Sequence, residues 1–404
     1  MADEKKKNRK SKTESKVPVE EDLDLFGDHK PKRRVPRFIY RIALILLLCT
    51  VGLTLWLNRD NISLEGFWGW LQTQVVGTGY GGGYPASITG RETDEENLIA
   101  DNNQPAIVSD TEIMIFNSTA KELLTTQHSC ATPVLCEAGG RYMVYDLGGT
   151  TYQIVSAQKV LKKGEASQTI YAAALAGNGR WALGTASQDY MSELTVYLED
   201  GTKQYRYQFV DTRVTAVALS DDGTRGAVAA VTAQDGALVS KLYLFDFSKE
   251  EPVAIYESRD NFLYQLSMEG DRVCAVGDNS ALTVTFGNET ISEYTYDGTL
   301  CDAALHGDRM VLAISRYTGE TRIVEFDGGS DPITQFSVTG DVLSVDMNGS
   351  TLAVLTQGHV GLYLSGTGDR TGEQDVDNDT RALALGDGKT VYLLGAGEIR
   401  QIVF

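Results

Sequence analysis

The chain has 404 residues and a formal net charge of −19, but that charge is unevenly distributed. Residues 1–41 contain 13 basic and 8 acidic side chains, whereas residues 42–404 contain 23 basic and 47 acidic ones. The long acidic part repels polyanions, so we expect no nucleic acid partner.

The N-terminal part of the sequence predicts a membrane anchor. Residues 1–36 are basic and low in hydrophobicity, which is typical of a disordered tail. Residues 37–57 then include an uncharged run, Ile42 to Leu57, and about twenty mainly apolar residues are enough to cross a bilayer as a helix. Basic side chains crowd the segment that precedes this run, and only Arg59 follows closely. The positive-inside rule therefore predicts an uncleaved, single-pass signal anchor in the plasma membrane, with the N-terminus cytoplasmic and the C-terminal part outside.

Residues 58–83 connect the predicted anchor to the rest of the chain. Their first part is apolar and contains Trp68 and Trp70, which is typical of a segment lying at the membrane interface. Their last part, Gly77 to Gly83, contains five glycines and predicts a flexible linker.

From residue 84 to residue 404 a β-rich unit repeats. Each unit begins with a short apolar run rich in small residues, continues through a turn, and ends with a more polar run such as Lys203–Phe209. The turns share a glycine, at Gly140, Gly179, Gly223, Gly270, Gly307, Gly349 and Gly388. Their spacing of 37 to 47 residues predicts an all-β fold, a β-propeller. The alanines of the first runs, such as Ala172–Ala174, suit innermost strands, which converge on the propeller axis.

The two ends of the repeat decide the number of blades. Asn97–Ala100 has the pattern of an additional innermost strand, and the last unit, which ends with Glu398–Phe404, lacks an outer strand. Residues 84–89 could supply that missing strand and close the ring, which would remove a free sheet edge. We therefore prefer eight blades, with seven as the alternative.

One turn carries a resemblance. The segment Ala218-Leu-Ser-Asp-Asp-Gly-Thr-Arg-Gly-Ala-Val228 resembles the turn of WD40-like repeats, with Asp221 in place of the usual proline. The order of parts also resembles an uncharacterised family of bacterial single-pass membrane-anchored propeller proteins. That resemblance implies an architecture and no assigned activity.

The sequence contains no convincing catalytic, metal or cofactor site. The three histidines beyond the anchor, His128, His306 and His359, lie in different units, which argues against a histidine metal site. Trp181 is the only tryptophan after Trp70, so the quinone-binding propeller repeat, which needs one tryptophan in each blade, is absent. Four cysteines fall in the repeat region, and their spacing leaves their disulfide state open: Cys130, Cys136, Cys274 and Cys301.

A set of polar and aromatic residues is predicted to lie in links and turns on one face of the propeller. Such residues on a rigid scaffold are typical of binding sites. They are Asp189, Tyr190, Asp211, Arg213, Arg259, Asp260, Arg316, Tyr317 and Arg381. The sequence favours a non-enzymatic scaffold or sensing module that binds a protein or another envelope component. The alternative is an envelope glycan hydrolase or lyase with carboxylates at the axis, for which Asp302, Asp341 and Asp346 are the candidates.

Overall fold

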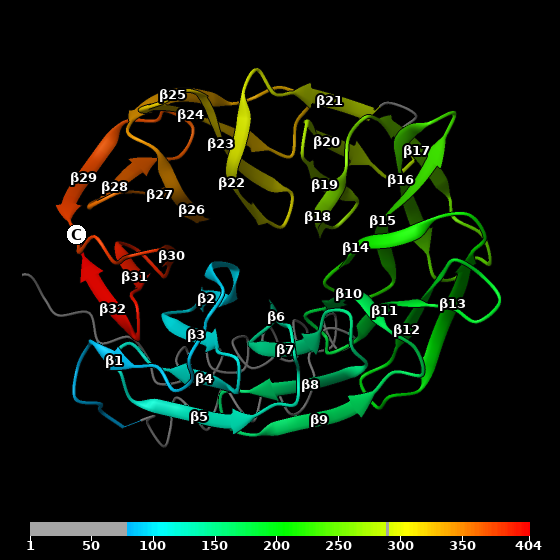
Figure 1. Ribbon diagram of the computed structural model, residues 1–404, viewed down its shortest axis with the longest axis horizontal. Coiled ribbons are helices and arrows are strands. Elements are labelled where there is room, and N and C mark those ends of the chain that lie inside the picture. Colours follow the sequence, from blue (N-terminus) through cyan, green and yellow to red (C-terminus); the bar gives the residue numbers. More distant parts are fainter. Residues whose placement is uncertain (1–78, 288–290) are drawn as a thin grey trace, which may run out of the picture. The chain divides into compact units, whose positions relative to one another are not determined.

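The computed structural model describes residues 79–287 and 291–404, which form eight antiparallel four-stranded sheets (Figure 1). The predicted tail, the anchor 37–57 and the interfacial segment lie outside these described residues. Within residues 79–287 and 291–404, no helix is long and apolar enough to cross a membrane.

Each sheet is one blade, and in blades 1 to 7 the strands run in chain order from the innermost to the outermost. Blade 1 contains β2 (Leu98–Asp101), β3 (Gln104–Val108), β4 (Glu112–Phe116) and β5 (Glu122–Gln127); blade 2 contains β6 (Pro133–Ala138), β7 (Arg141–Asp146), β8 (Thr151–Ser156) and β9 (Val160–Glu165); blade 3 contains β10 (Ile170–Leu175), β11 (Trp181–Ala186), β12 (Ser192–Tyr197) and β13 (Lys203–Phe209). Blade 4 contains β14 (Arg213–Leu219), β15 (Arg225–Gln234), β16 (Ala237–Asp246) and β17 (Ala254–Arg259); blade 5 contains β18 (Leu263–Glu269), β19 (Arg272–Gly277), β20 (Ser280–Thr285) and β21 (Ile291–Thr295). Blade 6 contains β22 (Thr299–His306), β23 (Arg309–Tyr317), β24 (Glu320–Asp327) and β25 (Thr334–Thr339); blade 7 contains β26 (Val342–Asn348), β27 (Thr351–Thr356), β28 (His359–Leu364) and β29 (Arg370–Asp375).

Blade 8 joins the two ends of the described chain. It contains β30 (Ala382–Leu385), β31 (Thr390–Leu394), β32 (Glu398–Val403) and, as its outer strand, β1 (Ala86–Ser87). Ala86 pairs with Ile399 and Ser87 with Glu398. The prediction of eight blades closed by residues 84–89 is confirmed, and the seven-blade alternative is wrong because Leu98–Asp101 is an innermost strand of its own.

The hydrophobic core is divided into eight layers, each between two neighbouring blades. Strand β7 shows how one strand serves two layers: Tyr142 and Val144 pack toward blade 1, while Met143 and Tyr145 pack toward blade 3. Successive side chains of a strand point to opposite faces of the sheet, and both faces of a blade are covered. This arrangement explains why the sequence shows continuous apolar runs instead of an alternation of apolar and polar residues.

Small residues appear where neighbouring blades approach most closely. Ala172 and Ala174 of β10 pack with Val214 and Val217 of the next blade. Gly184 in β11 lies even closer to that blade, because a Cβ atom there would be 2.5 Å from Cγ1 of Val214. The crowding near the axis that the alanine-rich runs predict is therefore present.

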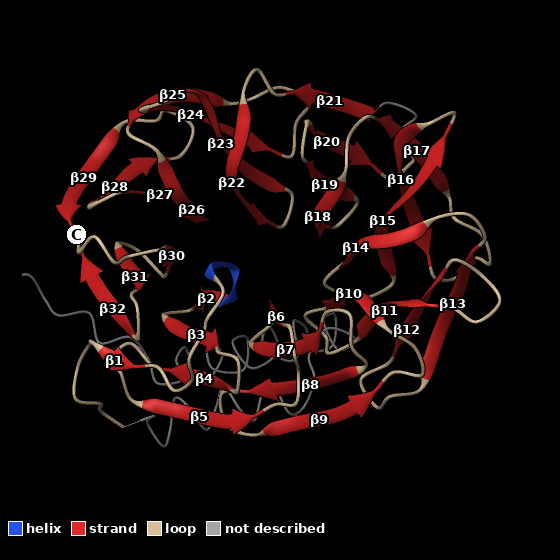
Figure 2. Cartoon of the chain, in the orientation of Figure 1, coloured by secondary structure: helices blue, strands red, loops and turns tan. Residues whose placement is uncertain are grey.

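Buried polar side chains also tie successive blades together. Asn97, at the end of the short 3-10 helix η1 (Glu95–Asn97, blue in Figure 2), donates to the carbonyl of Pro133 at 2.8 Å and accepts from the amide of Leu135 at 2.9 Å. Glu325, in β24 of blade 6, is fully buried and accepts from Arg309 at 2.8 Å and from the amide of Gly366 in blade 7 at 2.9 Å. These bonds tie blade 1 to blade 2 and blade 6 to blade 7.

The strand order gives the propeller two distinct faces. Because the strands alternate in direction, the links between blades and the turns between second and third strands share one face, here called the upper face. The turns between first and second strands and between third and fourth strands share the opposite, lower face. All seven turn glycines predicted from the sequence have positive φ angles on this lower face, for example Gly223 at 59°.

The described chain enters the propeller on the lower face. Unlike a free linker, Gly79 to Gly83 is bound to the turn between β4 and β5. The carbonyl of Gly79 accepts from Asn117 at 3.1 Å, and the amide of Gly83 donates to the carbonyl of Thr119 at 3.1 Å. A Cβ atom on Gly81 would be 2.3 Å from the backbone nitrogen of Lys121, so this close approach requires glycine.

Candidate functional site

All nine predicted binding residues lie on the upper face. Asp189 and Tyr190 occupy the turn between β11 and β12, and Arg316 and Tyr317 end β23. The other five lie in links between blades or at the strand ends beside them: Asp211, Arg213, Arg259, Asp260 and Arg381. They are spread from blade 3 to blade 8, and their role in binding remains a prediction.

Several of these residues already have partners within the face. The guanidinium of Arg213 lies 5.3 Å from the ring centroid of Tyr171 in blade 3, which allows a cation–π contact. Arg316 and Arg322 both contact the carboxylate of Asp297, with Arg322 at 2.9 Å. Arg381 is half-buried, and its Nε has no hydrogen-bond partner among the described residues.

The innermost strands share a feature that the sequence did not reveal. In blades 3 to 7 the pairing of the first strand with the second shifts by one residue near the start of the first strand. Such a β-bulge leaves one residue outside the ladder and re-aims its side chain. The extra residues are Tyr171, Thr215, Tyr264, Cys301 and Leu343. These five side chains mark the beginnings of the inner strands on the upper face.

Exposed apolar side chains follow the same face from blade 2 to blade 7. The most exposed are Val210 and Tyr317, each with 73% of its surface accessible. The complete set on this face is Leu147, Tyr190, Met191, Val210, Leu238, Tyr264, Tyr317 and Leu343. Six other large apolar side chains are exposed in the described parts of the chain, and they lie toward the lower face or the outer rim. Only Tyr190 and Tyr317 of the upper set were predicted from the sequence.

Two of the candidate axial carboxylates hold backbone groups of neighbouring strands. Asp302 accepts from the amides of Val345 in blade 7 and Ala303, each at 2.8 Å. Asp346 accepts from the amides of Leu385 in blade 8 and Met347, each at 2.7 Å. In each case one oxygen reaches the next blade, so both carboxylates join inner strands.

Burial dominates the electrostatics of Asp302 and Asp346. Burial raises the pKa of Asp302 and of Asp346 to about 6, although the backbone hydrogen bonds act in the opposite direction. Asp341, the third candidate, is exposed in the link between blades 6 and 7 and accepts from the amide of Gly319 at 3.1 Å. A hydrolase needs at least one carboxyl group that is free to meet substrate, and the bonds of Asp302 and Asp346 do not favour that role.

The described residues also contain few groups suited to metal binding or to nucleophilic catalysis. No group of three or more histidine, cysteine or acidic side chains in residues 79–287 and 291–404 is arranged to hold a metal ion. The four cysteines of the propeller are free thiols, and burial raises the pKa of Cys136 and Cys274 to about 12, far above the range of a reactive thiolate.

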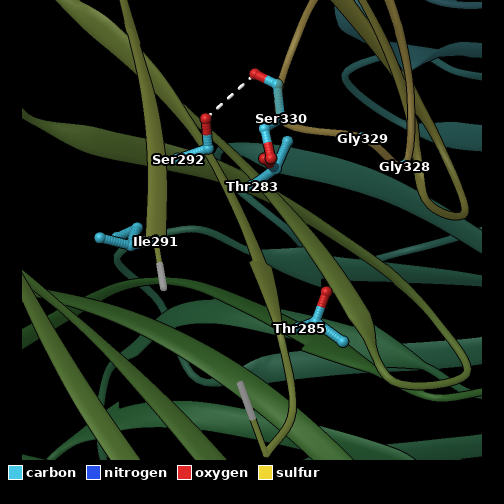
Figure 3. A pocket seen from close by; sticks show the side chains of 7 residues that line it. All are labelled: Thr283, Thr285, Ile291, Ser292, Gly328, Gly329 and Ser330. Carbon is cyan, nitrogen blue, oxygen red and sulfur yellow. Dashed lines mark hydrogen bonds between the residues drawn. The ribbon is translucent and has the colours of Figure 1, made fainter. Parts of the chain in front are cut away.

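A small pocket lies away from the upper face, between the outer strands of blade 5 and the lower turn of blade 6 (Figure 3). Its lining contains no charged side chain, and Ser292 crosses it to donate to the carbonyl of Ser330 at 3.0 Å. The lining residues are Thr283, Thr285, Ile291, Ser292, Gly328, Gly329 and Ser330.

The comparison with protein families decides where this propeller belongs. The model of the family of unknown function DUF5711 matches residues 85–404, from the closing strand to the last residue. The chain belongs to the DUF5711 family. None of the curated proteins compared with it matches.

Solved structures resemble this DUF5711 propeller in fold. The C-terminal WD40 domain of Sif2 is 11% identical with a TM-score of 0.56, over 80% of this chain and 99% of that one. Raptor from Chaetomium thermophilum is 10% identical with a TM-score of 0.51, over 79% of this chain and 28% of that one. BamB from Moraxella catarrhalis is 12% identical with a TM-score of 0.47, over 80% of this chain and all of that one. The similarity to Sif2 and Raptor shows the β-propeller fold, and at such identities it leaves the activity open.

Proposed function

We propose that this protein is a non-enzymatic binding platform of the cell envelope, anchored to the plasma membrane by residues 37–57, that docks a protein partner on its upper face. The observation that carries the proposal is the series of exposed apolar side chains on this face, at least one in each blade from blade 2 to blade 7. Exposed apolar groups interleaved with polar ones mark interaction surfaces.

The construction of the upper face supports protein docking. Its side chains extend from links and bulges on eight sheets that are packed against one another, so a partner meets a surface that is already ordered. Tyrosines are prominent on this face, for example Tyr190, Tyr264 and Tyr317. Tyrosine offers a large apolar area together with one polar group and is enriched in protein interfaces.

The first described residues contact the opposite face. Gly79 to Gly83 is bound to a turn of the lower face and so covers none of the upper face.

Site-specific photocrosslinking in intact cells tests the proposal. A photoreactive residue replaces either Leu343 on the upper face or Leu364 at the lower end of β28, which are matched because each is 39% exposed. We expect a discrete adduct with another protein from position 343 and none from position 364. Adducts from position 364 alone, or from neither position in the full-length chain, would contradict the proposal.

A further inference from the structure

The upper face is acidic as well as apolar. Seven exposed aspartates lie in its links and turns between blade 3 and blade 7. They are Asp189, Asp211, Asp235, Asp260, Asp278, Asp297 and Asp341. The same arc contains the exposed apolar side chains, so that Asp189 precedes Tyr190 and Met191, and Asp235 lies close to Leu238.

The basic side chains of this arc do not neutralise it. Lys241 is shared between Asp211 at 3.5 Å and Glu257 at 4.0 Å, and Arg316 and Arg322 share Asp297. No basic side chain of the described residues lies within 4 Å of the carboxylates of Asp189, Asp235 or Asp260. Three more arginines belong to the same arc: Arg206 interacts electrostatically with Asp189, and Arg213 and Arg259 are exposed. The seven aspartates, together with the exposed Glu257 and Glu320, still outnumber these six basic side chains, so the face carries a net negative charge.

We infer that the partner of the upper face is a cationic, amphipathic polypeptide segment that places lysines or arginines on these aspartates and apolar side chains on the tyrosines. The inference rests on the proposed function and adds the chemistry of the partner. Complementary charge across an interface steers encounter and excludes wrong partners, while buried apolar groups supply affinity. An anionic partner, such as nucleic acid, would be repelled.

A peptide-binding experiment with the purified full-length chain tests this chemistry. The probe is a fluorescent amphipathic lysine–leucine peptide, and the comparison peptides are a glutamate–leucine peptide and a lysine–serine peptide of equal length. We expect saturable binding of the lysine–leucine peptide at one site, measured by anisotropy, and much weaker binding of the other two. Raising the ionic strength from about 0.01 M to about 0.1 M shortens the screening length from about 30 Å to about 10 Å and should weaken the binding.

Matched variants place the peptide on the face. Asp189→Asn, Asp235→Asn and Asp260→Asn together should lower the affinity about tenfold, as expected for three exposed charge pairs. Asparagine suits the left-handed backbone of Asp235 and Asp260, whose φ angles are 53° and 52°, so the fold is preserved. The control carries the same change at three exposed aspartates of the lower face, Asp221, Asp271 and Asp331.

Each other outcome would overturn the inference. Equal binding of the glutamate–leucine peptide would show that charge does not select the partner, and an equal loss in the lower-face control would place the peptide elsewhere. Binding that appears only after removal of the basic residues 1–16 would identify the chain's own tail as the occupant. If photocrosslinking captures a partner at position 343 but that partner is acidic where it contacts the face, the inference fails while the proposed function stands.

Discussion

Removal of the Asp346 carboxylate should loosen the contact between blades 7 and 8. The side chain accepts from the amides of Met347 and Leu385, each at 2.7 Å, and both of these residues are buried. In Asp346→Ala both amides lose their acceptor, and each buried, unsatisfied group costs about 1–3 kcal/mol, or about 2–6 kcal/mol together. In Asp346→Asn the amide oxygen still serves one of the two N–H groups, so we expect about 1–3 kcal/mol.

These free energies translate into modest shifts of the melting temperature. The entropy of unfolding is about 2.1 cal/mol/K per residue, or about 0.7 kcal/mol/K for about 320 residues of propeller. Asp346→Ala should therefore lower Tm by about 3–9 °C, and Asp346→Asn by about 2–4 °C.

Far-UV circular dichroism of the full-length chain at pH 7 measures these shifts, with the exposed Asp331→Asn as the control. Hydrogen exchange at the Leu385 amide gives a local readout, because that proton should exchange faster in both Asp346 variants. If Asp346→Ala has the same Tm as the wild type and the Leu385 amide remains protected from hydrogen exchange, the carboxylate does not join the blades. Our assignment of its role would then be wrong.

Four further predictions concern pH, a buried charge, ring closure and topology. Because burial raises the pKa of Asp346 from 3.8 to about 6, the proton-linked part of its contribution to stability is complete below about pH 4 and is lost as pH rises through about 6. The Tm difference between wild type and Asp346→Asn should therefore be larger at pH 4.5 than at pH 7.5, and a constant difference would argue against the shift. Glu325→Ala should lower stability by about 3–5 kcal/mol in chemical denaturation, because it leaves Arg309 without its buried partner, and an unchanged midpoint would show that the pair is dispensable. Deletion of residues 84–89 should expose the edge of β32 and promote aggregation, measured by light scattering, whereas a monomer of equal stability would refute this account of ring closure. Protease added to intact cells should remove the propeller and spare the tail, and protection of the propeller would contradict the predicted orientation.

The sequence determined the repeat and its closure. Each blade needs two buried middle strands and a tight lower turn, so apolar runs and turn glycines such as Gly223 recur at a readable spacing. The missing outer strand after Glu398–Phe404 and the spare strand at residues 84–89 were equally visible, because both are properties of local pattern. Placing the nine predicted residues on one face needed only the alternation of strand direction.

Only the tertiary structure decided the contacts that cross between blades. Asp302 and Val345 are 43 residues apart in the chain, and nothing in either local pattern shows that a carboxylate of one inner strand reaches the amide of the next. The same holds for Glu325 and Gly366, which are 41 residues apart. For this reason the sequence did not show that Asp302 and Asp346 bind backbone amides of the next blade.

The bulges and the exposed apolar side chains of the upper face could not be predicted from the sequence for a different reason. A bulge shifts the pairing by one residue, and that shift depends on the neighbouring strand and not on the strand's own sequence. Tyr264 and Leu343 therefore read as ordinary residues of buried strands, although both are exposed on the upper face. Whether an apolar side chain is covered depends on the packing of its neighbours, which only the assembled ring defines.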